Sequence, residues 1–162
     1  MTLSSRLALL AAGTTALGIS VAGCLGDGTG DWEQDQTLPV ASATQYQGPS
    51  CDCCDVYADY LQDHLESELD VTVTDELDAV KQEHGIERDL RSCHTVVLDE
   101  YVVEGHMPVE GIETLFDDEP AINGIALPGM PAGSPGMGGE KTETWTVYGL
   151  EDGSDPSVYT DI

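Results

Sequence analysis

Three of the five cysteines lie within four residues, in the run Cys51-Asp52-Cys53-Cys54. Cys51 and Cys54 have the Cys-x-x-Cys spacing. At a helix N-terminus, unpaired amides and the helix dipole stabilise a thiolate, which is both a nucleophile and a soft metal ligand. Asp52 and Asp55 oppose this effect through their negative charge. A structural disulfide alone explains the run poorly, because three cysteines so close together cannot all pair within it.

Three further segments carry donor atoms of similar chemistry. Cys93-His94 stands where a strand is expected to begin, and His106 lies in a turn, in Gly105-His106-Met107-Pro108. Residues 128–137 form a Gly/Pro-rich loop with Met130 and Met137. Helical packing does not explain methionines in such a loop, although methionine also fills irregular core gaps, so both roles stay open for these two. His64 and His84, beside acidic residues on expected helices, are expected to be solvated.

Thiolate, imidazole and thioether together form a soft ligand set, which favours Cu(I). Thiolates can bridge several copper ions, so the site can be multinuclear. Zinc would accept the cysteines and histidines but makes little use of thioethers. The predicted metal ligands are Cys51, Cys53, Cys54, Cys93, His94, His106, Met130 and Met137.

The elements that must position these residues follow from the apolar periodicity. Residues 38–46 can form a first short strand. An apolar residue recurs every fourth position from Tyr57 to Leu69, which predicts a helix of about 14 residues starting near Cys54. Val71 and Val73 alternate in a short strand. A second helix follows, capped by Thr74 or Asp75 and closed by Gly85.

The second half continues with a hairpin and a third helix. The β-branched runs 95–98 and 101–104, separated by Asp99-Glu100, predict the hairpin. Pro108 opens a helix that Pro120 stops, and a strand is possible at 144–148. The order strand, helix, strand, helix, strand, strand, helix predicts an α/β protein of thioredoxin-like fold, with a central mixed sheet flanked by helices. In that layout Cys93 and His94 face Cys51 and Cys54.

The whole chain of 162 residues has room for one ordinary domain, and 40% hydrophobic residues can supply its core. The chain has 31 acidic and 5 basic side chains, for a net charge of -26. Such a surface repels nucleic acid and anionic membranes, which excludes DNA or RNA as an expected partner. Because dense ions screen self-repulsion, we interpret the charge as an adaptation to high salt.

The N-terminus predicts export. Arg6 precedes an apolar run over residues 7–22, which ends in Val21-Ala22-Gly23-Cys24. This is the pattern of a signal peptide over residues 1–23 with a lipobox, after which Cys24 carries the lipid. A simple cleaved signal or an uncleaved anchor are the alternatives. We expect a polar tether over 24–45, the working domain over 46–150 outside the cytoplasmic membrane, and a polar tail over 151–162.

Four segments together resemble the CopG-like copper-resistance family, also described as domain-of-unknown-function 411 proteins. They are Gly48-Pro49-Ser50-Cys51-Asp52-Cys53-Cys54, Ser92-Cys93-His94-Thr95, Glu104-Gly105-His106, and the methionine loop with Pro128-Gly129-Met130-Pro131 and Gly133-Ser134-Pro135-Gly136-Met137. The match covers roughly residues 46–150 in order and spacing. Tyr57 stands where members often have Trp. Met107 replaces a common Val, as an additional thioether or a neutral change.

The resemblance implies a thioredoxin-like domain that handles copper in metal resistance outside the cytoplasmic membrane. Its expected partners are copper ions and copper-exporting or copper-oxidising proteins, with membrane contact only through the lipid. Three alternatives remain open. Cys51 and Cys54 could be the catalytic residues of a thiol–disulfide oxidoreductase, or of a copper oxidoreductase. The third alternative is a zinc-stabilised structural module.

Overall fold

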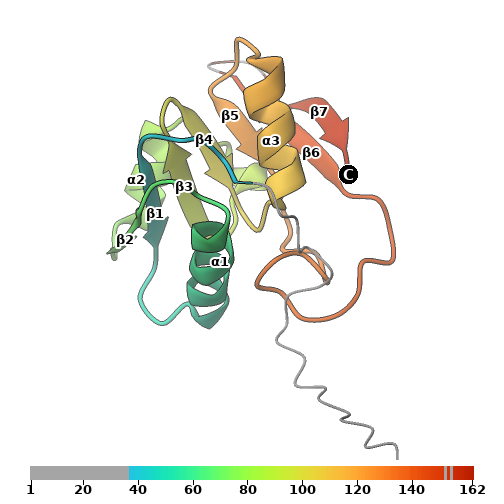
Figure 1. Cartoon of the computed structure of the whole chain (residues 1–162). Coiled ribbons are helices and arrows are strands. Elements are labelled where there is room, and N and C mark those ends of the chain that lie inside the picture. The colour runs from blue at the N-terminus through green and yellow to red at the C-terminus, as the bar shows by residue number, and fades with distance from the viewer. Residues whose placement is uncertain (1–36, 152, 154) are drawn as a thin grey trace, which may run out of the picture.

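The computed structural model describes residues 37–151, 153 and 155–162, and shows one seven-stranded mixed sheet with three α-helices (Figure 1). The predicted signal peptide, Cys24 and most of the predicted tether lie outside the described residues. The strands are β1 (Ala43–Gln47), β2 (Leu69–Val73), β3 (His94–Leu98), β4 (Tyr101–Glu104), β5 (Gly124–Ala126), β6 (Thr146–Leu150) and β7 (Ser157–Asp161). The helices are α1 (Asp52–Asp63), α2 (Leu77–Glu83), the 3-10 helix η1 (Arg88–Leu90) and α3 (Val109–Asp118).

The strand order is β2-β1-β3-β4-β5-β6-β7. β1 is parallel to β2 and antiparallel to β3, and β3 forms a hairpin with β4. β4 is parallel to β5, β5 is antiparallel to β6, and β6 is antiparallel to β7. The α/β class and the order of the first seven elements are therefore confirmed. The order and directions of the first four strands are compatible with a thioredoxin-like layout.

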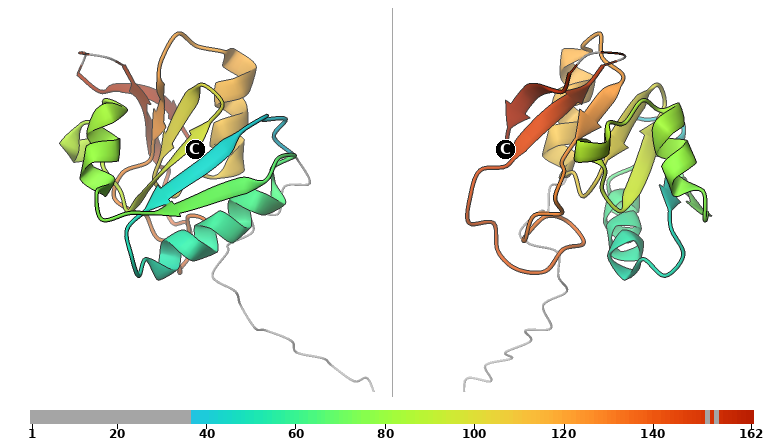
Figure 2. Two further views of the ribbon diagram at one scale, coloured as in Figure 1. Left: turned by 90° about the vertical axis from the view of Figure 1, so that its left-hand side faces the viewer. Right: turned by 180° about the vertical axis from the view of Figure 1, so that it is seen from behind.

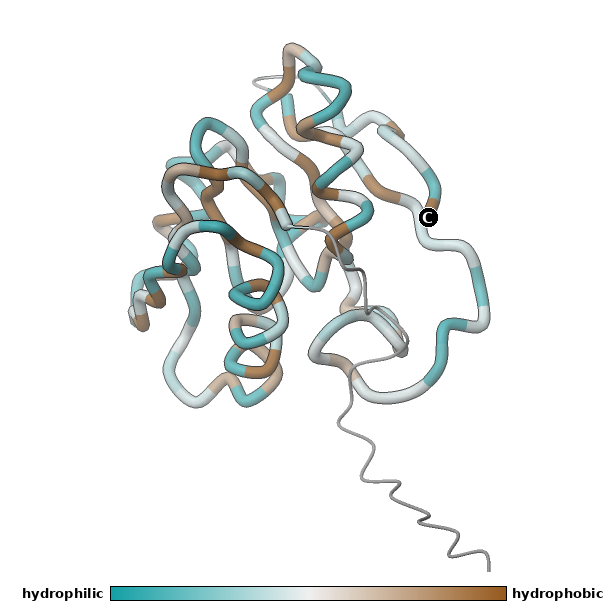
Figure 3. Tube along the Cα trace, viewed as in Figure 1, coloured by the Kyte–Doolittle hydropathy of each residue, from teal (hydrophilic) through white to brown (hydrophobic). Residues whose placement is uncertain are grey.

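Helices cover both faces of the sheet. The larger core lies between the sheet and the helices α1 and α3, with Tyr57, Leu61, Ile112 and Leu115 fully buried. A smaller cluster, including Ile86 and Leu90 of the α2–η1 region, covers the opposite face. The side and rear views show α2 across the sheet from α1 and α3 (Figure 2). Hydrophobic positions concentrate on the strands and helices, whereas the long loop after β5 is largely hydrophilic (Figure 3).

α1 begins and ends earlier than predicted. Cys51 is its N-cap, so Cys53 and Cys54 lie in its first turn. The helix stops at Asp63, and Leu65 instead forms an isolated bridge with Leu38. Leu69 opens β2. The four-residue spacing continued past the helix because these leucines reach the same core from different elements.

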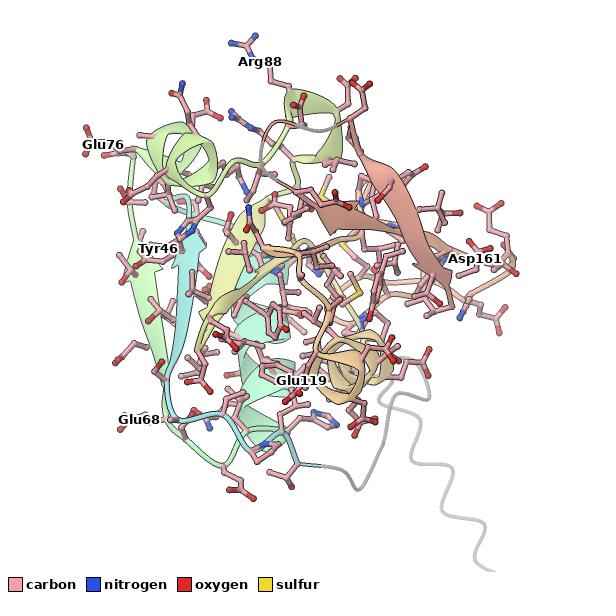
Figure 4. All side chains as sticks on the ribbon, turned by 90° about the horizontal axis from the view of Figure 1, so that it is seen from above. Tyr46, Glu68, Glu76, Arg88, Glu119 and Asp161 are labelled. Carbon is pink, nitrogen blue, oxygen red and sulfur yellow. A yellow bond between two sulfur atoms is a disulfide. The ribbon has the colours of Figure 1, made fainter. Side chains whose placement is uncertain are left out.

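Two strands were not predicted. β5 has three residues and contains a glycine, too short for a periodic signal. β7 lies within the segment expected to be a polar tail, and its position at the sheet edge explains its polar composition. Acidic residues such as Glu68, Glu76, Glu119 and Asp161 are exposed, and Glu68, Glu76 and Asp161 lie at the rim of the view in Figure 4. Of the described helices, none has the length and apolar character needed to cross a membrane.

Candidate metal centre

The first half of the site is the start of α1. Cys51 and Cys54 form a disulfide, with their Cα atoms 5.2 Å apart. The Cys51 carbonyl accepts hydrogen bonds from the amides of Cys54 and Asp55 at 3.0 and 3.2 Å, which closes the first turn. This turn therefore holds the Cys-x-x-Cys pair at the positive end of the helix dipole, as the spacing predicted.

Two further thiols lie beside the disulfide. Cys53 and Cys93 are free, with their sulfur atoms 3.8 Å apart. The Cys53 sulfur is also 3.7 Å from that of Cys51. All four sulfur atoms lie within 4.8 Å of one another, close enough to share metal ions as bridging thiolates once the disulfide is reduced.

The second half of the site comes from the β3–β4 hairpin. The Cys93 sulfur lies 3.0 Å from His106 Nε2 and 3.4 Å from His94 Nδ1. His106 Nδ1 is 2.7 Å from the Pro135 carbonyl, which can only accept a hydrogen bond. Nδ1 therefore carries a hydrogen, and the neutral ring has its Nε2 lone pair on the Cys93 side. Such a carbonyl partner fixes the orientation of a metal-binding histidine.

Burial keeps both histidines neutral. Their side chains are fully buried, and their ring centroids are 4.7 Å apart in an edge-to-face arrangement. Burial lowers the pKa of His106, and burial together with the charge of His106 lowers the pKa of His94 well below its ordinary value. Burial and the adjacent Cys53 raise the pKa of Cys93 to about 12. Without metal, the site therefore favours neutral imidazoles and a protonated thiol.

The donor set fits a soft metal ion. The histidine and thiol donors face one another across distances that an ion could bridge, and imidazole and thiolate both suit copper. His94 Nε2 is buried and has no hydrogen-bond partner among the described residues. The ring presents its other nitrogen, Nδ1, to the Cys93 sulfur at 3.4 Å, so Nδ1 is the His94 atom placed to act as a ligand in this cluster.

The methionines occupy different environments. Met130 is 40% exposed and Met137 is half-buried. Met107 is fully buried against Gly111 of α3, so it fills the core rather than the site.

The methionine loop nevertheless reaches the site through its backbone. Pro135 receives the His106 hydrogen bond described above. A Cβ atom at Gly136 would lie 2.8 Å from the Cys53 carbonyl oxygen and 3.2 Å from His106 Nδ1. The loop thus packs directly against the first turn of α1, at the same end of the molecule (Figure 1).

Sequence reasoning missed several supporting residues. Gln45 and Gln47 are buried polar residues on β1, and Gln45 Nε2 donates to the Cys54 carbonyl at 2.9 Å. Polar residues at inward positions of a strand were the available signal. The Tyr57 ring packs 4.4 Å from that of His94, and its hydroxyl donates to the Met107 carbonyl at 2.8 Å. His64, expected to be solvated, is 7% exposed because its Nδ1 bonds the Tyr60 carbonyl at 2.8 Å.

The buried histidines predict a loss of stability in acid. Above about pH 6.5 they are neutral in both the folded and the unfolded chain. Below it the unfolded chain takes up protons that the folded chain, with lowered histidine pKa values, does not. Each histidine then weakens the metal-free fold by up to about 1.4 kcal/mol per pH unit, until the pH reaches its folded-state pKa.

Urea unfolding at several pH values would check this against a variant with His94→Gln and His106→Gln. The variant should lose less stability than the natural chain as the pH falls from about 6.5. His84→Gln, a change outside the site, should leave the natural dependence in place. Equal pH dependence in the natural chain and the double variant would contradict the prediction.

The chain is thus an α/β protein with a cysteine–histidine cluster capable of binding metal. A family model described as "Protein of unknown function, DUF411" matches residues 90–137. Two solved structures, of copper resistance protein copG in form 2 and form 1, are 33% and 32% identical to this chain in sequence, with TM-scores of 0.67 and 0.66. Each match covers 77% of this chain, and 99% and 98% of those chains. No curated protein gives a significant match.

The chain therefore belongs to the CopG-like copper-resistance family, as its four motifs predicted. The model match spans Cys93, His94, His106 and both loop methionines but begins after the cysteine run. The matches to the solved structures extend over nearly the whole of those chains.

Proposed function

We propose that this chain is an extracytoplasmic copper-binding protein of copper resistance or homeostasis, which holds Cu(I) at the cysteine–histidine site. The observation that carries the proposal is the position of Cys93. Its sulfur belongs both to the group of four cysteines and to the group with His94 and His106. The names of the similar structures, which are copper resistance proteins, support copper as the metal.

Several Cu(I) ions can share this site. Four sulfur atoms within 4.8 Å of one another suit bridging thiolates, which leave each copper ion with more than one sulfur ligand. His94 and His106 would complete the set from the hairpin side. Met130 and Met137 remain proposed thioether ligands, supported by the contact of the neighbouring Gly136 and Pro135 with the site.

The Cys51–Cys54 disulfide supports a redox role for the same site. Reduced Cys51 and Cys54 can give one electron to each of two Cu(II) ions, which yields two Cu(I) ions, the disulfide and two protons. Cys51 and Cys54 would then be the redox-active residues. Copper-exporting or copper-oxidising proteins are the partners we propose for receiving the product.

The test is an anaerobic titration of the reduced full chain with Cu(I) against a competing chelator, with Zn(II) in parallel. We expect two or more Cu(I) ions per chain, bound far more tightly than zinc because thiolates favour the softer ion. Replacing Cys51 and Cys54 together by serine should collapse Cu(I) binding. Cys24→Ser, which changes the one cysteine outside the cluster, should leave it unchanged.

Copper binding that survives the double serine substitution would contradict the proposal. Weak copper binding by the natural chain, with Cys51 and Cys54 closing readily to the disulfide, would favour the thiol–disulfide oxidoreductase instead. Tight zinc binding, with unfolding on chelation, would favour a zinc-stabilised module.

Export and lipid attachment at Cys24 form a separate part of the proposal, supported by the apolar run and Val21-Ala22-Gly23-Cys24. The natural chain should fractionate with the membrane of the host cell and gain the mass of a lipid on its N-terminal residue. Cys24→Ser should release it from the membrane fraction. Mass spectrometry and fractionation check this, and equal membrane association of both chains would rule out the lipid as the anchor.

A further inference from the structure

A buried ion pair lies on the opposite side of the sheet from α1. Lys81 of α2 and Glu104, the last residue of β4, are 2% and 0% exposed, and Lys81 Nζ is 2.5 Å from Glu104 Oε1. Of the basic residues that the structure describes, Lys81 is the one that is buried. The function argued above uses neither residue.

The hydrogen bonds of this pair converge on the segment around Cys93. Glu104 Oε1 also accepts from the Ser92 amide at 2.5 Å, and Glu104 Oε2 accepts from the Thr95 hydroxyl at 2.6 Å. Lys81 Nζ donates to the same Thr95 hydroxyl oxygen at 2.9 Å. The carboxylate therefore holds the residue immediately before Cys93 and the residue two positions after it.

The backbone that carries Glu104 also leads directly to His106. Glu104 lies two residues before His106, and it pairs with Thr95 across the hairpin. Gly105, between Glu104 and His106, has a φ of +86°. A Cβ atom there would lie 2.5 Å from the Leu127 carbonyl oxygen and 3.1 Å from Ser92 Cβ. The turn that carries His106 thus packs closely against the turn that carries Cys93.

Stability does not account for such an arrangement. The desolvation of two charges offsets much of their attraction, so a buried ion pair often adds little stability compared with apolar residues of similar size. A fully satisfied buried network does, however, specify one local geometry. Here that geometry is the path of the backbone on either side of Cys93.

We propose that Lys81 and Glu104 are positioning residues, which hold the Cys93 sulfur against Cys53 and His106 by fixing Ser92 and Thr95. This inference deepens the proposed copper function and rests on it for its significance. We call the Lys81–Glu104 pair, with its hydrogen bonds to Ser92 and Thr95, the clamp. It is present in the metal-free chain, so it can be tested without copper.

The main test variant carries Lys81→Met and Glu104→Met in the full chain, which replaces the ion pair by two apolar side chains and leaves no unpaired charge. The first readout is native-state alkylation of the metal-free chain by iodoacetamide, with the Cys51–Cys54 disulfide intact. Peptide mass mapping gives the ratio of the Cys93 rate to the Cys53 rate. We expect the ratio to rise several-fold, because Cys93 loses its clamp while Cys53 stays on α1.

The second readout is the Cu(I) affinity of the reduced chain. Partners that orient metal ligands typically contribute about 10–100-fold to metal affinity, and we expect a loss of that size. Urea unfolding accompanies both readouts. A purely structural role would change the urea midpoint but leave the alkylation ratio and the Cu(I) affinity as in the natural chain, and that result would overturn the proposal.

Thr95→Val covers the case in which the double variant does not fold. It removes one hydroxyl and keeps a β-branched residue in β3, and should change both readouts in the same direction. Thr146→Val is the matched control, because Thr146 also donates its hydroxyl to a carboxylate, that of Asp161, but in the β6–β7 pair. Natural readouts in Thr95→Val would likewise overturn the proposal. Failure of the natural chain to bind Cu(I) would overturn the copper function instead, while the alkylation ratio would still test the clamp.

Discussion

Replacing Cys93 by serine should weaken Cu(I) binding more than replacing Cys53 by serine. The Cys93 sulfur is 3.8 Å from that of Cys53 and 3.0 Å from His106 Nε2, so it joins the cysteine run to the hairpin histidines. A serine oxygen is a poor ligand for Cu(I), because the ion prefers soft donors. We expect Cys93→Ser to lower the Cu(I) affinity by more than the factor of about 10–100 that is typical for residues that only orient a metal ligand.

The measurement is a chelator competition with the reduced chain under anaerobic conditions, in which the two serine variants are compared directly. Cys53→Ser is a stringent control because Cys53 also contacts two sulfur atoms, those of Cys51 and Cys93, but neither histidine. Equal Cu(I) affinities of the two variants would contradict the prediction that Cys93 links the cysteine run to the hairpin side of the site.

The second large effect is expected at Gly136. This residue has a φ of +77°, and a Cβ atom would meet the Cys53 carbonyl at 2.8 Å and the Tyr57 amide at 3.1 Å. Gly136→Ala should therefore lift the loop from α1 and break the bond between His106 and the Pro135 carbonyl. We expect a stability loss of about 1–3 kcal/mol from the overlap alone, together with weaker Cu(I) binding.

Gly129→Ala separates the overlap from backbone strain. Gly129 has a similar φ of +83°, yet nothing lies within 4 Å of the position of its Cβ. Both alanine variants bear the cost of a left-handed residue, about 1–3 kcal/mol. Urea unfolding and Cu(I) competition should therefore show the additional loss in Gly136→Ala. Equal behaviour of the two variants would mean that the loop does not need to contact α1.

Much of the fold follows from local patterns in the sequence. The hairpin was predicted from two β-branched runs, and the structure pairs them from Thr95–Glu104 to Leu98–Tyr101. The third helix was predicted from Pro108 and the apolar spacing after it, and α3 begins at Val109. These elements have strong signals because their periodicity is carried by residues that are buried on one side.

The end of α1 could not be predicted in the same way. Leu65 and Leu69 continue the helical spacing, but the backbone leaves the helix after Asp63 so that Leu65 can pair with Leu38. Tertiary packing decides such a boundary, and local spacing does not record it. β7 was not predicted because an edge strand has too few buried residues to produce an alternating pattern.

The donor residues of the candidate site were predicted from the sequence, but the residues that position them were not. Clustered cysteines and histidines bind metal, form disulfides or take part in catalysis, so their spacing was informative from the sequence alone. Lys81 gave no such signal, because a lysine on a helix of an acidic protein is expected to be solvated. Its burial depends on Glu104, 23 residues later, and only the fold brings the two together.

The chain separations within the site have a consequence for the order in which the site assembles. Cys93 and His106 are 13 residues apart, across one hairpin, whereas Cys53 and Cys93 are separated by 40 residues. Closing a short loop costs less chain entropy than closing a long one, and hairpins form within microseconds. An unfolded chain can therefore form the histidine half of the site locally, while the cysteine quartet exists only after α1 has docked on the sheet. The proposed capture of copper by all four thiolates therefore requires the folded protein and is not open to the unfolded chain.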